Sequence, residues 1–184
     1  MDTPKVVLHQ EDVRRALTRI AHEISERNHD PDALALVGIH RRGAHLARRL
    51  QGLLSELLAS ELALGELDIG FYRDDVASRG GAPVLHASNI DFDVAHRTIV
   101  IVDDVLYTGR TVRAAIEALF AYGRPDRVQL AVLADRGHRE LPIRPDYIGK
   151  NLPTSHAEHV YVRVLELDGV DEVAIAPAQT RTPA

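Results

Sequence analysis

The chain has 184 residues, of which 45% are hydrophobic and 27% charged, with a formal net charge of −5, as in an ordinary globular protein of about one domain. This charge argues against a generally basic nucleic-acid binder but leaves room for a local basic face, and the lack of cysteine excludes disulfides and thiolate zinc sites. The N-terminus has no signal-peptide pattern, and no apolar run approaches the ~20 residues that span a bilayer, so we expect a cytoplasmic protein without membrane contacts.

The hydrophobic pattern predicts helices and strands in alternation along the chain. Apolar residues at helical spacing predict helices over residues 11–27, 45–58 and 111–122. Short apolar runs predict strands over residues 34–39, 67–72, 98–102, 128–133, 160–165 and 172–175, with one more near Tyr147. This alternation favours an α/β fold, with a mostly parallel central sheet covered by helices on both faces.

The pattern also predicts a single domain over residues 1–184, with its core at about 6–175 and a tail at 177–184. Residues 73–90 show little periodicity. A loop of this length inside a compact domain is unusual, and lids and binding loops are frequent explanations. A lid and a plain surface excursion are equally compatible with this segment.

Two adjacent carboxylates, Asp103 and Asp104, directly follow the apolar run 98–102. Neighbouring anions repel, and burying either one is costly unless a cation or a hydroxyl donor compensates it. In an open parallel sheet, ligands bind beyond the carboxyl ends of the strands, and we expect the two aspartates to lie just past such an end. The pair therefore predicts a ligand site.

A turn and the start of a helix follow the two aspartates. A helix N-terminus presents unpaired N–H groups, Gly109 allows a phosphate to approach the backbone, and Thr108 and Thr111 add hydroxyl donors. Carboxylates beside an anion cradle suit a sugar phosphate, with Mg²⁺ moderating the negative charge. A capped turn with exposed acids and a receiver-type acidic pocket are the alternatives, whereas a P-loop is excluded because no G-K-[ST] follows the glycine.

The stretch V-D-D-V-L-Y-T-G-R-T, residues 102–111, resembles the phosphoribosyl diphosphate (PRPP) binding motif of type I phosphoribosyltransferases. The resemblance implies that Asp103 and Asp104 hold the ribose hydroxyls, take part in catalysis and contact Mg²⁺ indirectly. It implies that the 5′-phosphate is wrapped by the residues that follow them, namely Val105, Leu106, Tyr107, Thr108, Gly109, Arg110 and Thr111.

The same resemblance assigns two further loops. G-I-H-R-R-G, residues 38–43, stands where the family grips the diphosphate, which makes Arg41 and Arg42 its expected ligands. The loop at 73–90 matches the family's flexible lid, and Arg73 would arrive with it as a catalytic cation. Such a lid would keep water away from the activated sugar.

Longer blocks narrow the resemblance to the PyrR family, over about residues 6–173. They are L-D-I-G-F-Y-R-D-D, Y-G-R-P and L-A-V-L-A-D-R-G-H-R-E-L-P-I-R-P-D-Y-I-G-K-N-L-P-T-S, with R-R-A-L-T-R-I-A-H-E in the first helix. That family comprises bifunctional regulators of pyrimidine operons with uracil phosphoribosyltransferase activity. The resemblance implies Mg²⁺-dependent conversion of uracil and PRPP to UMP, and UMP-promoted binding to a stem-loop in the leader of pyrimidine biosynthetic mRNA. It also implies a small hood beside the sheet and a homodimer or larger homo-oligomer.

Family position further suggests where the base and the RNA bind. The base is expected near Asp135, Arg136 and the backbone around Ile148. The expected RNA contacts are Arg14, Arg15, Thr18, Arg19 and His22 on the first helix and Arg139, Arg144 and Lys150 further along the chain. Charge alone favours an ordinary solvated face for these residues, and only the resemblance favours RNA.

One departure from the family pattern bears on catalysis. Arg41 stands where the diphosphate loop usually has threonine. An extra cation can tighten diphosphate or crowd the loop, so the alternative function is a nucleotide-sensing RNA-binding regulator with negligible catalysis. A transferase for another base, without an RNA role, is a third hypothesis.

Overall fold

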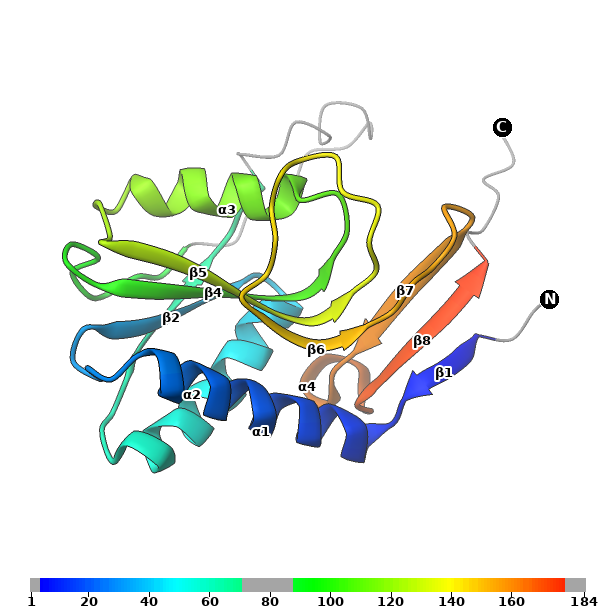
Figure 1. Ribbon diagram of the computed structural model, residues 1–184, viewed down its shortest axis with the longest axis horizontal. Coiled ribbons are helices and arrows are strands. Elements are labelled where there is room, and N and C mark those ends of the chain that lie inside the picture. The colour runs from blue at the N-terminus through cyan, green and yellow to red at the C-terminus, as the bar shows by residue number, and fades with distance from the viewer. Residues whose placement is uncertain (1–3, 71–87, 178–184) are drawn as a thin grey trace.

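The computed structural model describes residues 4–70 and 88–177, which form two sheets and four helices (Figure 1). The helices are α1 (Gln10–Arg27), α2 (Arg42–Leu58), α3 (Arg110–Phe120) and α4 (Leu165–Asp168). The strands are β1 (Lys5–Leu8), β2 (Leu34–Ile39), β3 (Ala63–Leu67), β4 (Thr98–Leu106), β5 (Arg127–Asp135), β6 (Tyr147–Asn151), β7 (Glu158–Arg163) and β8 (Glu172–Pro177).

The larger sheet has five parallel strands in the order β3-β2-β4-β5-β6. Helices α1 and α2 cover one face and α3 covers the other (Figure 1). Because successive side chains of a strand point to opposite faces, Leu34 and Leu36 of β2 join the core under α1 and α2, whereas Ala35 and Val37 join the core under α3. The predicted parallel α/β sheet is therefore confirmed.

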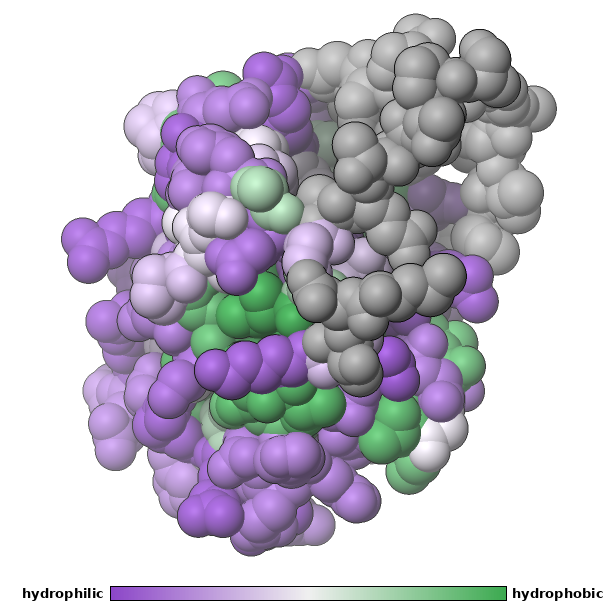
Figure 2. All heavy atoms as spheres, turned by 90° about the vertical axis from the view of Figure 1, so that its right-hand side faces the viewer, coloured by the Kyte–Doolittle hydropathy of each residue, from purple (hydrophilic) through white to green (hydrophobic). Residues whose placement is uncertain are grey.

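The smaller sheet is the hood implied by the resemblance. It is antiparallel, in the order β1-β8-β7, and stands beside the edge of the large sheet (Figure 1). Leu8, Val162 and Val173 are paired across its strands and bury their side chains in the same core as α1 and α2. Figure 2 shows this side of the molecule, where hydrophobic residues, in green, lie among hydrophilic ones, in purple.

Several details of the predicted elements are wrong. No strand begins at residue 67: β3 ends there because its partner β2 ends at Ile39, opposite Leu67. Strand β1 and the one-turn helix α4 were not predicted, since four residues are too few to show a period. Helix α2 begins at Arg42 rather than residue 45. Residues 71 and 72 of the expected strand lie outside the described residues.

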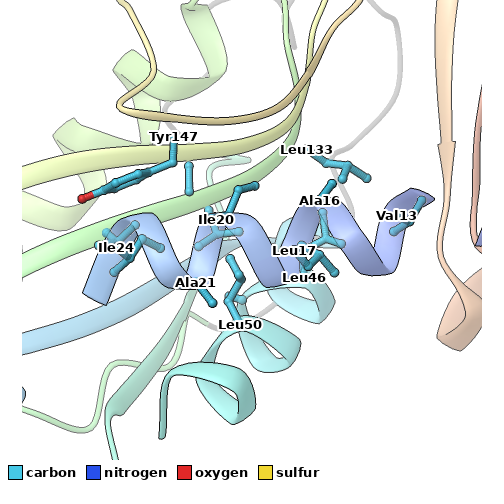
Figure 3. Close-up of a cluster of buried hydrophobic side chains, with 14 of the residues drawn as sticks. Val13, Ala16, Leu17, Ile20, Ala21, Ile24, Leu46, Leu50, Leu133 and Tyr147 are labelled. Carbon is cyan, nitrogen blue, oxygen red and sulfur yellow. The ribbon is translucent and has the colours of Figure 1, made fainter. Parts of the chain in front are cut away.

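A buried polar cluster connects the end of α1 to β5 and β6. Asn28 donates from Nδ2 to Ile24 O at 2.8 Å, to Gln129 Oε1 at 3.1 Å and to the Tyr147 hydroxyl at 3.2 Å. The Tyr147 hydroxyl donates in turn to Gln129 Oε1 at 3.0 Å, and burial raises the pKa of this phenol. Figure 3 shows the Tyr147 ring lying over the α1 end that carries Ile24. The cluster fixes the direction of α1 under the sheet.

Replacing Tyr147 by phenylalanine is expected to lower the free energy of unfolding by about 1 kcal/mol, because a buried hydrogen bond is lost while the ring still packs. Tyr161→Phe is the matched control, since Tyr161 is partly exposed on β7 and stacks on His159. Urea denaturation of both variants measures the difference. Equal stability of the two variants would show that the buried cluster contributes nothing.

None of the helices in residues 4–70 and 88–177 is long and apolar enough to cross a membrane.

Candidate active site

The two aspartates lie on β4, inside the parallel sheet. Strand β5 supplies partners along β4, with Asp103 opposite Val132 and Leu106 opposite Asp135. The prediction that the aspartates follow the end of the strand is therefore wrong, because β4 extends four residues beyond the apolar run on which the prediction relied. They still lie in the carboxyl-terminal half of the strand. Asp103 is buried, and Asp104 is half-buried.

Each carboxylate is oriented by a neighbouring backbone group. Asp103 Oδ1 accepts a hydrogen bond from the Asp104 N–H at 2.9 Å, and Asp104 Oδ1 accepts one from the Val105 N–H at 2.8 Å. The two acids are thus held in place on β4, shortly before the turn that leads to α3.

That turn, residues 107–109, is called the phosphate-loop turn below. It encloses a pocket of about 260 Å³, the phosphate-loop pocket. Gly109, with φ of +94°, is the N-cap of α3, a left-handed backbone conformation that glycine adopts without steric cost. All seven residues predicted to wrap a phosphate line the pocket, together with one of the aspartates. Its lining residues are Asp103, Val105, Leu106, Tyr107, Thr108, Gly109, Arg110, Thr111, Val112 and Glu140.

The loop between β5 and β6, residues 136–146, braces this turn, and we call it the bracing segment. The backbone N–H groups of Glu140 and Leu141 both donate to Thr108 O, at 3.0 and 3.1 Å. The Arg110 guanidinium, in the first turn of α3, donates from Nε to Glu140 Oε2 at 2.8 Å. The pocket therefore has a wall from a second loop, and this wall carries an acid.

Arg139 is engaged inside the bracing segment. It donates to Tyr107 O at 2.8 Å and to Ile143 O at 3.0 Å, and it forms an ion pair with Asp135. Only 23% of its side chain is exposed. Its predicted contact with RNA stays a prediction, and the structure adds that Arg139 holds the turn in shape.

Arg136 is a buried cation, 4% exposed. Its guanidinium donates to Thr154 Oγ1 at 3.2 Å, to Ser155 O at 3.2 Å and to Glu158 O at 2.7 Å. It also lies over the Tyr107 ring, 4.1 Å from the centroid. These contacts connect the phosphate-loop turn to the start of β7, so Arg136 positions the loops around the expected base site.

The expected diphosphate loop, residues 38–43, includes the first turn of α2. A Cβ placed on Gly43 would lie 2.5 Å from Val102 O and 3.2 Å from Asp103 Cα. Only a residue without a side chain permits this approach. The loop that carries Arg41 and Arg42 therefore lies against β4 at the aspartates, as expected of the two halves of one site.

The two arginines of this loop differ in their surroundings. Arg41 is exposed, whereas Arg42 donates to both carboxylate oxygens of Asp168 in α4, at 2.8 and 3.1 Å. Burial opposes ionisation of Asp168, but the Val164 N–H and Arg42 outweigh it and lower the pKa of this carboxyl. Arg42 thus ties the loop to the hood.

A second bridge ties α2 to the hood about two helical turns further along. Arg49 donates to both oxygens of Glu166, at 2.9 and 2.6 Å, and to both oxygens of Asp171, at 3.0 and 2.8 Å. The hydrogen bond from Arg49 lowers the pKa of Glu166. The hood therefore positions α2 and, through it, the expected diphosphate loop.

Of the expected base-binding groups, Asp135 ends β5 and Arg136 follows it, whereas Ile148 is the second residue of β6. Asp135 accepts from the Gly137 N–H at 2.9 Å, in addition to its ion pair in the bracing segment. The Ile148 carbonyl accepts from Arg19 Nη2 at 2.9 Å, and the Gly149 carbonyl accepts from the same nitrogen. The carbonyl of Ile148 therefore already has a partner, and the base contact stays a prediction.

The expected RNA residues lie on three parts of the chain: five on α1, Lys150 on β6, and Arg139 and Arg144 in the bracing segment. Helix α1 adjoins β6, because Arg19 donates to the carbonyl next to Lys150. Two of the α1 arginines share one acid: Arg14 and Arg15 lie 2.5 and 3.4 Å from Glu11. Thr18 and Arg139 are half-buried, and the other expected residues are exposed, namely Arg14, Arg15, Arg19, His22, Arg144 and Lys150.

Two acids of the site were not predicted. Asp168 lies 126 residues from Arg42 along the chain, and no local pattern indicates that contact. Glu140 stands in the block H-R-E-L that carries part of the resemblance, but its sequence position does not reveal that it reaches the phosphate-loop turn. Arg73 and most of the expected lid lie outside the described residues, and of the expected tail only Pro177, the last residue of β8, is described.

The donor set fits Mg²⁺ in one respect. Asp103 and Asp104 supply the hard oxygen ligands that this ion prefers. Within residues 4–70 and 88–177, no group of three or more acids or histidines is arranged to hold a metal. The indirect contact of Asp103 and Asp104 with Mg²⁺ stays a prediction.

Comparisons with solved structures agree with this architecture. A hypoxanthine phosphoribosyltransferase of Trypanosoma cruzi in a ternary substrate complex is 21% identical, with a TM-score of 0.72 over 94% of this chain and 95% of that one. A purine phosphoribosyltransferase of Pyrococcus horikoshii is 28% identical, with a TM-score of 0.62 over 82% and 89%. The type I phosphoribosyltransferase fold predicted from the sequence is confirmed.

Sequence comparisons are more specific. The family model for the phosphoribosyl transferase domain matches residues 5–166. A bifunctional protein PyrR of Roseiflexus sp. (strain RS-1) is 59% identical over 93% of this chain and 94% of its own, and one of Deinococcus radiodurans is 54% identical over 95% and 96%. With the phosphate-loop pocket and the aspartates in place, the conclusion is direct: this chain is a phosphoribosyltransferase that belongs to the bifunctional PyrR family.

Proposed function

We propose that this protein transfers the phosphoribosyl group of PRPP to uracil, giving UMP and diphosphate. UMP in turn promotes binding of the protein to a stem-loop in the leader of pyrimidine biosynthetic mRNA, and this binding favours transcription attenuation. The observation that carries the proposal is the pocket after β4, where an anion cradle adjoins two oriented carboxylates. The relatives named bifunctional PyrR support a pairing of enzyme and regulator. A cytoplasmic location and a homo-oligomeric state, both typical of the family, belong to the same proposal.

The proposed reaction needs charge stabilisation rather than a covalent nucleophile. A uracil nitrogen attacks the anomeric carbon and loses its proton, while the bond to diphosphate breaks. The ribose becomes cation-like in the transition state, and Asp103 and Asp104 stabilise it through its hydroxyls. Bound Mg²⁺ supplies positive charge to the oxygens of PRPP.

The leaving group requires cations at the other side of the sugar. Arg41 is the exposed cation of the diphosphate loop, and Arg42 lies beside it but is paired with Asp168. We therefore assign the direct contact with diphosphate to Arg41 and the positioning of the loop to Arg42. The arginine that replaces the usual threonine would then serve catalysis.

The RNA half of the proposal rests on exposed cations of α1, of the adjoining strand β6 and of the bracing segment. Side chains of Arg14, Arg15, Arg144 and Lys150 reach solvent there, and sequence-specific RNA binding usually targets unpaired loop bases rather than long basic stripes. Few phosphate contacts are then sufficient, which agrees with the net charge of −5.

The transferase activity is tested by incubating the protein with Mg²⁺, PRPP and one base, which is uracil, hypoxanthine or orotate in three separate reactions. We expect UMP and diphosphate with uracil alone. No product with any base, while PRPP still raises the melting temperature, would instead identify a nucleotide sensor without turnover.

The RNA-binding activity is tested by titrating the protein with a pyrimidine leader stem-loop, with and without UMP. We expect UMP to raise the affinity for the RNA, and an affinity that UMP does not change would contradict the regulatory role.

A further inference from the structure

The phosphate-loop pocket contains a residue that does not fit a simple anion site. Its lining includes Glu140, which comes from the bracing segment rather than from the turn itself. A carboxylate in a cradle for phosphate repels the ligand that the cradle is built to hold. The Glu140 carboxylate lies 2.8 Å from Arg110 Nε, a cation of the same pocket.

The backbone holds Glu140 in this place. Its N–H group and that of Leu141 donate to Thr108 O, and Ile143 packs against Gly109, where an added Cβ would lie 3.3 Å from Ile143 Cδ1. The carboxylate is therefore delivered to the pocket by a fixed loop and does not reach it by chance from a mobile one.

The ion pair itself is weak enough to be exchanged. About half of each side chain is exposed, 51% for Arg110 and 52% for Glu140. Exposed pairs of this kind contribute roughly 0.2–1 kcal/mol, which corresponds to about 1.4-fold to 5-fold in an equilibrium constant. A bound phosphate that makes several further contacts displaces such a partner easily.

We propose that Glu140 sets the affinity of the phosphate subsite: it occupies Arg110 when no ligand is bound, and every phosphate group that enters must displace it. Inorganic phosphate gains only the cradle and must overcome the carboxylate. PRPP and UMP also place a ribose against Asp103 and Asp104, and this additional binding energy offsets the displacement of Glu140. Because this cost is common to the three ligands, it weakens the binding of each one, and the ligands that carry a ribose keep more of their affinity in absolute terms.

This inference rests on the proposed function, since it concerns the phosphate subsite of the same pocket. Glu140→Gln tests it because glutamine keeps the shape and a hydrogen-bond acceptor for Arg110 while removing the charge. Glu117→Gln is the matched control: Glu117 is an exposed acid on α3, 3.6 Å from Arg113, and does not line the pocket. Both variants change the net charge by the same amount.

Calorimetry with inorganic phosphate is the first measurement, and it does not depend on turnover. We expect Glu140→Gln to bind phosphate about twofold to fivefold more tightly than the wild type, and Glu117→Gln to bind it as the wild type does. Equal phosphate affinity in Glu140→Gln and the wild type would overturn the inference. So would an equal gain in both variants, since that would show an effect of net charge alone.

Steady-state kinetics with uracil and PRPP is the second measurement. We expect phosphate to inhibit Glu140→Gln more strongly, the KM for PRPP to fall about twofold to threefold, and kcat to fall as UMP leaves more slowly. A loss of kcat with unchanged phosphate inhibition would indicate a structural role and contradict the inference. If the wild type makes no UMP, the proposed enzyme is wrong, while the phosphate titration still decides the role of Glu140.

Discussion

Replacing Asp104 by asparagine is expected to lower kcat/KM for UMP formation by at least about 100-fold, with little change in the melting temperature. Groups that stabilise charge developing in a transition state typically contribute a factor of this size when they are preorganised. Asp104 meets that condition, because its Oδ1 accepts the Val105 N–H at 2.8 Å and its position on β4 is fixed by the sheet.

Asparagine is the informative substitution at this position. Its side-chain oxygen can accept the same hydrogen bond from Val105, so the turn keeps its shape while the negative charge is lost. Initial rates of UMP formation with uracil and PRPP, measured against Glu117→Gln as a charge-matched control outside the pocket, give the effect. A variant within about tenfold of the wild type would show that Asp104 carries no catalytic charge.

Replacing Gly43 by alanine is expected to lower the free energy of unfolding by about 2–3 kcal/mol and activity by at least about tenfold. The new Cβ would lie 2.5 Å from Val102 O, a backbone atom in the middle of the sheet. Since β4 cannot move cheaply, α2 must shift instead, and overpacking of this kind typically costs 1–3 kcal/mol. The shift would carry Arg41 and Arg42 away from the aspartates, and an error of about 1 Å in position is enough to slow catalysis strongly.

Gly52→Ala is the control for that prediction. Gly52 lies in the same helix, and a Cβ there would meet nothing within 4 Å. Alanine is the better helix former, so this variant is expected to gain about 0.5–1 kcal/mol. Urea denaturation and UMP formation are measured for both variants. If Gly43→Ala were as stable and active as Gly52→Ala, the close contact between α2 and β4 would have no importance.

The strands and helices of the central sheet were predictable because burial on both faces leaves a continuous apolar run. Leu34–Ile39 was predicted to the residue for that reason. The carboxyl-terminal part of β4 was missed because Asp103 and Asp104 interrupt the apolar run, although β5 continues to pair with them. Polar residues within a strand at a ligand site defeat a pattern that is based on hydrophobicity.

The sequence by itself determined the fold class, the family and the turn that forms the phosphate-loop pocket, because these depend on local patterns: apolar runs, adjacent acids, and a glycine before a helix. Contacts between distant segments were decided only by the tertiary structure. Asp168 holds Arg42 across 126 residues, and Glu140 enters the pocket across 30 residues to meet Arg110. Hydrogen bonds and ion pairs of this kind depend on where the strands and helices bring loops together. The identity of a single charged residue does not indicate which distant residue it will contact.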